Sequence, residues 1–305
     1  MTALLDSRTY APSSPDTATR LRVVDPGPLT TLQDAGRAGL AHLGIGGCGP
    51  ADRAAAALAN RLVGNPEGAP LLENVMGGLT VATSSPRYVS VTGAPAEVRV
   101  DGSIVAEPQR LYLHAGQRLS IARPPWGVRV YVAIAGGLAG RQVFGSCSTD
   151  SLSGLGPPAL RTGDELQVGA VVSDPPSARL ELTGTALPTG VIDLGFRWGP
   201  RDSLFSTADM RTLTSTTWSV GADSNRVGVR LTGPALSIGV VNLPSEGMPL
   251  GAIQVPPSGQ PIVFLADHPV TGGYPVIGVV TEPDLDLLAQ APPGARVSFS
   301  AMAGG

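Results

Sequence analysis

Short apolar runs, separated by glycine, proline and polar residues, dominate the pattern along the chain. Runs of this kind, rich in Val, Ile, Leu and Thr and bounded by turn-forming residues, are typical of β-strands. The strands that they predict are Tyr88–Thr92, Ala96–Val100, Leu111–Leu113, Arg118–Ile121, Val128–Ile134, Glu165–Val168, Ala252–Val255 and Ile262–Leu265. The pattern therefore predicts a mainly β protein with tight turns.

Helical periodicity is confined to three short stretches. Pro50–Val63 carries an apolar stripe at helical spacing, with proline at its start and Gly64 just beyond its end. Two shorter helices are expected at Thr207–Leu213, where Ser206 can act as the N-cap, and at Pro283–Gln290. These three segments are the only expected departures from strand and turn.

Length and composition suggest two domains. A chain of 305 residues with 42% hydrophobic residues can bury a sizeable core, and it exceeds the usual size of one domain. We expect a flexible tail over residues 1–20, a first β-barrel domain over 21–170, a proline-containing linker over 171–177 and a second β-barrel domain over 178–305.

Net charge and the absence of targeting patterns limit the classes of partner and the location that we expect. A net charge of −3 disfavours nucleic-acid binding. No apolar run approaches the ~20 residues of a membrane span, and no basic region followed by an apolar core opens the chain. We therefore expect a cytoplasmic protein that binds neither nucleic acid nor membrane.

The basic residues exclude several covalent cofactors. All 21 Lys and Arg residues are arginines. Without lysine the chain can form no Schiff base, bind no pyridoxal phosphate covalently, supply no Walker lysine and carry no attached biotin. Three histidines and two cysteines in unrelated contexts predict no metal site.

The stretch SEGMPLGAIQVPPSGQPIVFLADHPVTGGYP, from Ser245 to Pro275, gathers polar and turn-forming residues between strands and is the best candidate site. In Thr271-Gly272-Gly273-Tyr274 two glycines stand beside a hydroxyl and an aromatic ring. Glycine tolerates positive φ, so the backbone N–H groups of Gly272 and Gly273 could converge on an oxyanion. The alternative is an ordinary hairpin with a glycine bulge.

Four blocks of sequence carry a family resemblance. They are the GAIQVPPSGQPI…TGGYP stretch, the run from Pro26 to Glu73 with QDAGR and LANRLVGN, GSCSTD at Gly145–Asp150, and SNRVGVRLTGPAL at Ser224–Leu236. Together they resemble the allophanate hydrolase subunit 2 family, which also includes the C-type subunits of 5-oxoprolinase and is known as the biotin-dependent carboxyltransferase family. DHPVTGGYP and CGPAD depart from the commoner DRQTTGGYP and SGAMD of that family.

The resemblance implies two cyclophilin-like β-barrel domains and a heteromeric enzyme. It implies ATP-dependent hydrolysis of 5-oxoproline to glutamate, together with a first-subunit homologue (allophanate hydrolase subunit 1, or the B-type subunit of 5-oxoprolinase) and a lactam-utilisation subunit. One alternative is a urea or allophanate pathway in which carboxybiotin is held by a partner chain. Another is a non-catalytic regulatory subunit that binds the first-subunit partner. ATP is possible in the complex, and no phosphate-binding loop is visible in this chain.

Chemistry on a small amide or lactam needs a proton carrier and hydrogen-bond donors for an oxyanion. Glu246 is the candidate proton carrier or ligand of a metal-nucleotide, and as a loop residue it could simply be solvated. Gln254 is the candidate side-chain donor, and a polar barrel interior would explain it without catalysis. His268 and Tyr274 complete the candidate catalytic set, and either could instead be an ordinary exposed or satisfied side chain.

Substrate binding needs a positive anchor. Arg226 could pair with a carboxylate in bidentate fashion, or it could form a salt bridge between domains. The remaining binding candidates are Ser245, Thr271, Gly272 and Gly273 in the candidate stretch, and Gln33, Asp34 and Arg37 in the QDAGR motif. For this motif a structural role is at least as well supported.

Overall fold

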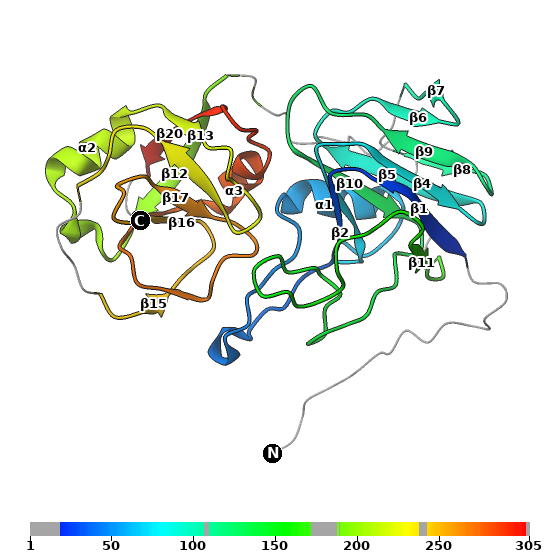
Figure 1. Ribbon diagram of the computed structural model, residues 1–305, viewed down its shortest axis with the longest axis horizontal. Coiled ribbons are helices and arrows are strands. Elements are labelled where there is room, and N and C mark those ends of the chain that lie inside the picture. Colours follow the sequence, from blue (N-terminus) through cyan, green and yellow to red (C-terminus); the bar gives the residue numbers. More distant parts are fainter. Residues whose placement is uncertain (1–18, 107–109, 172–187, 189, 238–242, 303–305) are drawn as a thin grey trace, which may run out of the picture.

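The computed structural model describes residues 19–106, 110–171, 188, 190–237 and 243–302. Its strands form two groups that lie side by side along the long axis of the molecule, one from residues 20–167 and the other from 192–301 (Figure 1). Most of the expected tail and all but the first residue of the expected linker lie outside the described residues, so the domain boundaries stay a prediction.

Two antiparallel sheets form the N-terminal group. The six-stranded sheet has, in spatial order, β11 (Glu165–Gln167), β1 (Arg20–Pro26), β4 (Leu79–Thr83), β9 (Arg118–Ile121), β6 (Val98–Val100) and β7 (Ser103–Ile104). The five-stranded sheet has β2 (Leu29–Gln33), β3 (Leu71–Val75), β10 (Arg129–Ile134), β5 (Arg87–Gly93) and β8 (Leu111–Leu113). One apolar core draws side chains from both sheets.

Burial along the strands shows which faces are covered. In β4 buried residues alternate with half-buried ones, as expected of a strand with one face on the core. In β10 all six residues are buried, because α1 (Arg53–Leu62) covers the second face of its sheet. Tyr131 and Ala133 pack there against Ala56 and Ala59 of the helix.

A closed seven-stranded barrel forms the C-terminal group. Its strands are, in order around the barrel, β12 (Ile192–Trp198), β19 (Val276–Val280), β16 (Ala252–Gln254), β17 (Ile262–Phe264), β14 (Gly228–Thr232), β13 (Trp218–Val220) and β20 (Arg296–Ala301). Only β12 and β20 pair in parallel among the described barrel strands. Closure leaves no free sheet edge in the ring. A separate two-stranded sheet joins β15 (Glu246–Gly247) to β18 (Thr271–Gly272).

The helices lie close to where the sequence predicts them. α2 (Thr207–Ser215) begins at a capping box between Ser206 and Asp209, and α3 spans Glu282–Ala289. α1 begins three residues later than expected because the side chain of Asp52 accepts from the backbone N–H of Ala55 and caps the helix there. Two 3-10 turns, η1 (Ala41–Leu43) and η2 (Asp202–Leu204), complete the elements. The mainly β prediction is confirmed.

Candidate functional site

The β15–β18 sheet brings together several of the predicted site residues at one end of the barrel. Glu246 pairs with Gly272, and Gly247 pairs with Thr271. Gln254, at the end of β16, lies directly beneath: a Cβ on Gly272 would be only 2.7 Å from Gln254 Nε2. Residues from three separate segments of the sequence therefore form one cluster.

Position 272 requires glycine because its backbone lies very close to the side chains of Gln254 and Met248. Neither Gly272 nor Gly273 has a positive φ, so the successive left-handed conformations of an anion-binding nest are not formed at these two residues. A side chain at position 272 would collide with Gln254 and with Met248. The glycine therefore lets the strand lie on the buried Gln254 amide, whose Nε2 donates to the carbonyl of Tyr274 at 3.4 Å.

Glu246 is held by a residue that the sequence did not single out. Arg201, just before η2, donates to both carboxylate oxygens of Glu246. Hydrogen bonding from Arg201 lowers the pKa of Glu246, so this carboxylate is ionised and a weak base at neutral pH. The geometry thus suits orientation of a donor or cation better than proton abstraction. Arg201 follows Trp198-Gly199-Pro200, outside all four resemblance blocks.

The polar groups of Ser245, Thr271 and Tyr274 face solvent at this end of the barrel. All three residues are exposed, and the tyrosine retains 50% of its accessible surface. Exposed hydroxyls beside a fixed carboxylate and a buried amide can line one wall of a binding site.

Arg226 lies at the junction of the two strand groups and is buried. Its Nη1 donates to Glu73 Oε1 at 2.5 Å, and its Nε and Nη2 donate to the two oxygens of Asp267 at 2.9 and 2.8 Å. Nη2 also donates to the carbonyl of Gly49 at 2.6 Å. Every guanidinium nitrogen is thus engaged. The geometry favours the salt-bridge alternative, because a substrate carboxylate would have to displace Glu73 or Asp267.

Electrostatics keep this cluster charged despite its burial. Burial alone would raise the pKa of Glu73, but Arg226 and Arg129 lower it below its ordinary value. Burial likewise opposes the charge of Arg226, yet Glu73 and Asp267 raise its pKa well above the usual range. Glu73 also accepts from the hydroxyl of Tyr131 and the N–H of Ala51, each at 2.9 Å. Each buried charge in this cluster is compensated by the others, so removing one member leaves a buried charge without its partner.

Residues from two of the resemblance blocks, and residues within or directly after the stretches of the other two, meet at this junction. Glu73 and Gly49 belong to the first block, Arg226 to the fourth, and Asp267 to the Ser245–Pro275 stretch. Ser151, directly after GSCSTD, donates to Asp267 through its N–H at 2.8 Å and its hydroxyl at 2.6 Å. We name Glu73, Arg226, Asp267 and Ser151 the junction cluster.

The QDAGR motif holds the GSCSTD segment. Asp34 accepts from the hydroxyls of Ser146 and Ser148 at 2.5 and 2.7 Å and from the N–H of Cys147 at 2.8 Å. Burial would raise the pKa of Asp34, but these hydrogen bonds lower it. Arg37 donates to backbone carbonyls of the same segment, including that of Ser148 at 2.7 Å. The two charges thus organise a loop without forming an ion pair with each other in the described residues.

Gln33 and His268 complete the predicted set. Gln33 is buried and its Nε2 donates to the carbonyl of Thr149 at 3.0 Å, so it too serves the GSCSTD segment. His268 Nδ1 contacts the carbonyl of Pro269 at 2.9 Å. A Cβ on Gly46 would lie 3.4 Å from the backbone carbonyl of His268, which places this histidine beside the first block. His268 is therefore near the junction cluster rather than an established member of the β15–β18 cluster.

Metal and membrane features are absent from the described part of the chain. No three or more His, Cys, Asp and Glu side chains gather there in a way that could hold a metal ion. None of the helices in the described ranges is long and apolar enough to cross a membrane. Cys48 and Cys147 are both buried, and burial raises the pKa of Cys48 to about 12, so neither is poised as a nucleophile.

Comparisons with known proteins agree with the sequence blocks. The model of the family described as "Carboxyltransferase domain, subdomain A and B" matches residues 43–301. The chain is 39% identical over 289 residues to the C-type subunit of 5-oxoprolinase from Escherichia coli (strain K12), covering 92% of this chain and 90% of that protein.

Two solved structures are similar over 95% of this chain. That of TTHA0988 has 36% sequence identity and a TM-score of 0.83, and this chain spans 56% of it. That of the Kluyveromyces lactis urea carboxylase has 27% identity and a TM-score of 0.87, and this chain spans 28% of it. The chain thus accounts for about half or less of each of these longer chains.

Proposed function

The chain belongs to the carboxyltransferase domain family, subdomain A and B, and we propose that it is one component of a cytoplasmic complex that hydrolyses 5-oxoproline to glutamate at the expense of ATP. The similarity to a C-type subunit of 5-oxoprolinase over nearly the full length of both chains carries this proposal. The complex contains a first-subunit homologue and a lactam-utilisation subunit.

In this proposal the β15–β18 cluster contributes one wall of the substrate site. Gln254 exchanges its hydrogen bond to the carbonyl of Tyr274 for one to the carbonyl oxygen of a small amide or lactam, where negative charge develops during attack on the carbonyl carbon. Glu246, fixed by Arg201, accepts from the N–H of the same group. The exposed hydroxyls of Thr271 and Tyr274 orient the substrate. ATP binds to a partner subunit.

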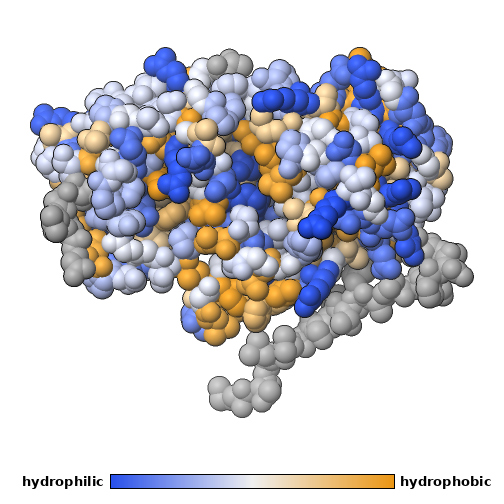
Figure 2. Space-filling model, viewed as in Figure 1, coloured by the Kyte–Doolittle hydropathy of each residue, from blue (hydrophilic) through white to orange (hydrophobic). Residues whose placement is uncertain are grey.

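Apolar surface supports a role within an assembly. Figure 2 shows apolar side chains gathered over the region that projects below the junction, where Figure 1 places η1. Leu43 of η1 is 59% exposed, and Phe144 and Leu152 are also large apolar side chains in solvent. Exposed apolar patches of this kind mark interaction sites more often than free surface.

Carboxyl transfer in a urea pathway is the second candidate function. The structural similarity to a urea carboxylase favours it. Because this chain has no lysine, the carboxybiotin would be carried by a partner chain and would enter the same cluster.

Glutamate release from 5-oxoproline and ATP tests the proposal. We would compare this chain alone, the chain co-purified with its first-subunit homologue, and the assembly with the lactam-utilisation subunit. Activity in the full assembly, lost in the variant Gln254→Ala with an unchanged assembly, is the expected result. A stable assembly that is inactive on 5-oxoproline but carboxylates urea in the presence of a biotin-carrying partner would replace the proposal with the second candidate.

A further inference from the structure

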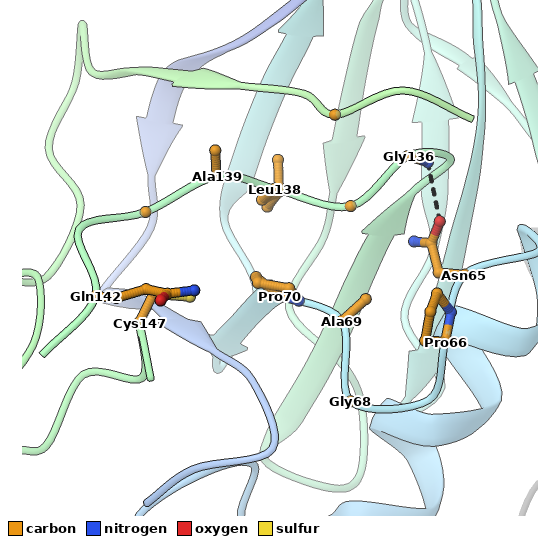
Figure 3. A pocket seen from close by; sticks show the side chains of 13 residues that line it. Asn65, Pro66, Gly68, Ala69, Pro70, Gly136, Leu138, Ala139, Gln142 and Cys147 are labelled. Atoms are coloured by element: carbon orange, nitrogen blue, oxygen red, sulfur yellow. Dashed lines mark hydrogen bonds between the residues drawn. The ribbon is translucent and has the colours of Figure 1, made fainter. Parts of the chain in front are cut away.

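A cavity of about 450 Å³ opens on the N-terminal group, apart from both clusters described above. It is lined by Asn65, Pro66 and residues 68–70, which follow α1, by residues 136–140, which follow β10, and by Gln142, Cys147 and Gly169 (Figure 3). None of the predicted site residues lines it. The volume lies in the range of small-molecule sites.

The segment from Gly137 to Gly140 runs along this cavity with one side of its backbone satisfied. On that side the N–H of Ala139 donates to the carbonyl of Gln167 at 2.8 Å, and the carbonyl of Gly137 accepts from the N–H of Gly169 at 3.0 Å. On the opposite side the N–H of Leu138 donates to the carbonyl of Pro70 at 3.1 Å. From Leu138 onward the alternation is that of an extended strand, whereas Gly137 itself has a φ of 70°.

The cavity side of this segment has unused hydrogen-bonding groups. In an extended strand the N–H and C=O of one residue point to the same side, so the carbonyl of Leu138 and the N–H of Gly140 share the side of Pro70. Neither group makes a hydrogen bond within the described residues. They lie two residues apart, the spacing at which a strand binds both the N–H and the C=O of one residue of a parallel neighbour.

The position of Gly140 is fixed by close packing. A Cβ at this position would lie 2.4 Å from Leu32 Cδ2 and 3.0 Å from the Cβ of Cys147. The strand therefore rests directly on these two buried side chains, and the N–H of Gly140 is presented by a rigid support rather than by a free loop.

The lining is neutral. No Asp, Glu, Arg, Lys or His is among the lining residues. Pro66, Pro70, Ala69 and Ala139 supply apolar contact surface, and the exposed Gln142 makes no hydrogen bond within the described residues. A charged ligand would find no counter-ion here, whereas a neutral amide would find a donor, an acceptor and apolar walls.

We propose that this cavity binds a small neutral N-acylated amino-acid amide in extended form, whose N–H donates to the carbonyl of Leu138 and whose C=O accepts from the N–H of Gly140. The two ligand groups flank one carbon atom, as in a single peptide residue, and the bonding is that of strand addition. The ligand side chain lies against the apolar wall, and Gln142 contacts the acyl end. This site goes beyond the proposed function, since binding requires neither ATP nor a partner subunit.

Titration of the isolated chain, labelled with nitrogen-15, tests the proposal by NMR. The probe is N-acetyl-L-alanine amide, and the matched control ligand is O-acetyl-L-lactamide, in which an ester oxygen replaces the N–H. We expect saturable shifts of the Gly140 amide resonance with the amide and binding that is roughly 5- to 10-fold weaker with the ester, the effect of about one hydrogen bond.

Two variants fix the location. Ala69→Leu fills the cavity and is expected to abolish the saturable shifts. Ala208→Leu, an equal change at an exposed position of α2, is expected to leave them unchanged. Equal binding of amide and ester, shifts that persist in Ala69→Leu, or no saturable shift in the unaltered chain would each overturn the proposal. An inactive complex in the glutamate assay would leave these results unaffected.

Discussion

Replacement of Arg226 by alanine tests whether the junction cluster holds the two strand groups together. In the variant Glu73 and Asp267 lose their shared partner, and both carboxylates have side chains with 0% exposure. Removal of one member of a buried ion pair costs about 3–5 kcal/mol, because the charge left behind is desolvated; Glu73 then keeps Arg129 at 3.5 Å, and Asp267 keeps its hydrogen bonds from Ser151. For a chain of this length the unfolding midpoint should fall by on the order of 10 °C.

The stability loss in Arg226→Ala should depend on pH in a definite direction. In the unaltered protein the folded-state pKa of Glu73 is lowered, so its contribution to stability is present above the unfolded pKa, near 4.5, and is lost as pH falls through the folded value. In Arg226→Ala only Arg129 remains to oppose burial, so the pKa of Glu73 rises relative to the unaltered protein. The variant is then penalised increasingly as pH rises above about 4.5. The stability difference between the two proteins should therefore be largest near pH 7 and shrink toward pH 4.

Urea unfolding at several pH values measures this difference, with Arg61→Ala as the matched control. Arg61 pairs with Glu67 at 2.8 Å, but both side chains are about half exposed, so the control should cost no more than about 0.5 kcal/mol. If Arg226→Ala costs as little as Arg61→Ala, or if its cost is the same at pH 4 and pH 7, the reasoning is refuted.

Three further predictions concern the remaining clusters. Gly272→Ala should reduce turnover of the assembled complex at least tenfold with little change in the unfolding midpoint, because the new methyl group displaces Gln254; equal turnover would remove this contact from the site. Arg201→Gln should move the acidic limb of the kcat/KM pH profile to higher pH, because it removes the hydrogen bonds that lower the pKa of Glu246; an unmoved limb would show that Glu246 does not control the reaction. Asp34→Asn should lower the free energy of unfolding by about 1–3 kcal/mol, measured in urea, because the amide has one acceptor oxygen and either the N–H of Cys147 or both serine hydroxyls lose theirs; a loss below about 0.5 kcal/mol, the limit set for the exposed Arg61–Glu67 pair, would contradict that role.

Local pattern predicted the three helices and eight of the twenty described strands, and it did not single out others such as β1–β4, β12–β14, β19 and β20. The strand runs and the three helices depend on residues that are neighbours in sequence, such as the Ser206 cap of α2. Closure of the C-terminal strands into a barrel depends on pairings between distant segments, such as β12 with β20. No local signal in a single sequence encodes such a pairing, and here the family resemblance supplied what periodicity could not.

The sequence predicted some of the site residues but not others, for a related reason. Residue type and spacing located Glu246, Gln254 and Gly272, which do meet in space. They could not reveal Arg201, because its partner lies 45 residues away and its own neighbours form no motif. They also could not decide between two roles for Arg226, since substrate anchoring and a buried ion pair demand the same side chain.

The junction cluster also limits where the proposed chemistry can occur. A cluster in which Arg226 bonds to both strand groups at once disfavours a hinge between them, because opening would expose three paired charges to separation. A substrate cleft that opens and closes within this chain is therefore disfavoured at the junction. The β15–β18 cluster, by contrast, includes the exposed residues Thr271 and Tyr274. For the proposed function, a partner subunit that covers this exposed end would exclude water from the reaction, and the assembly assay tests this.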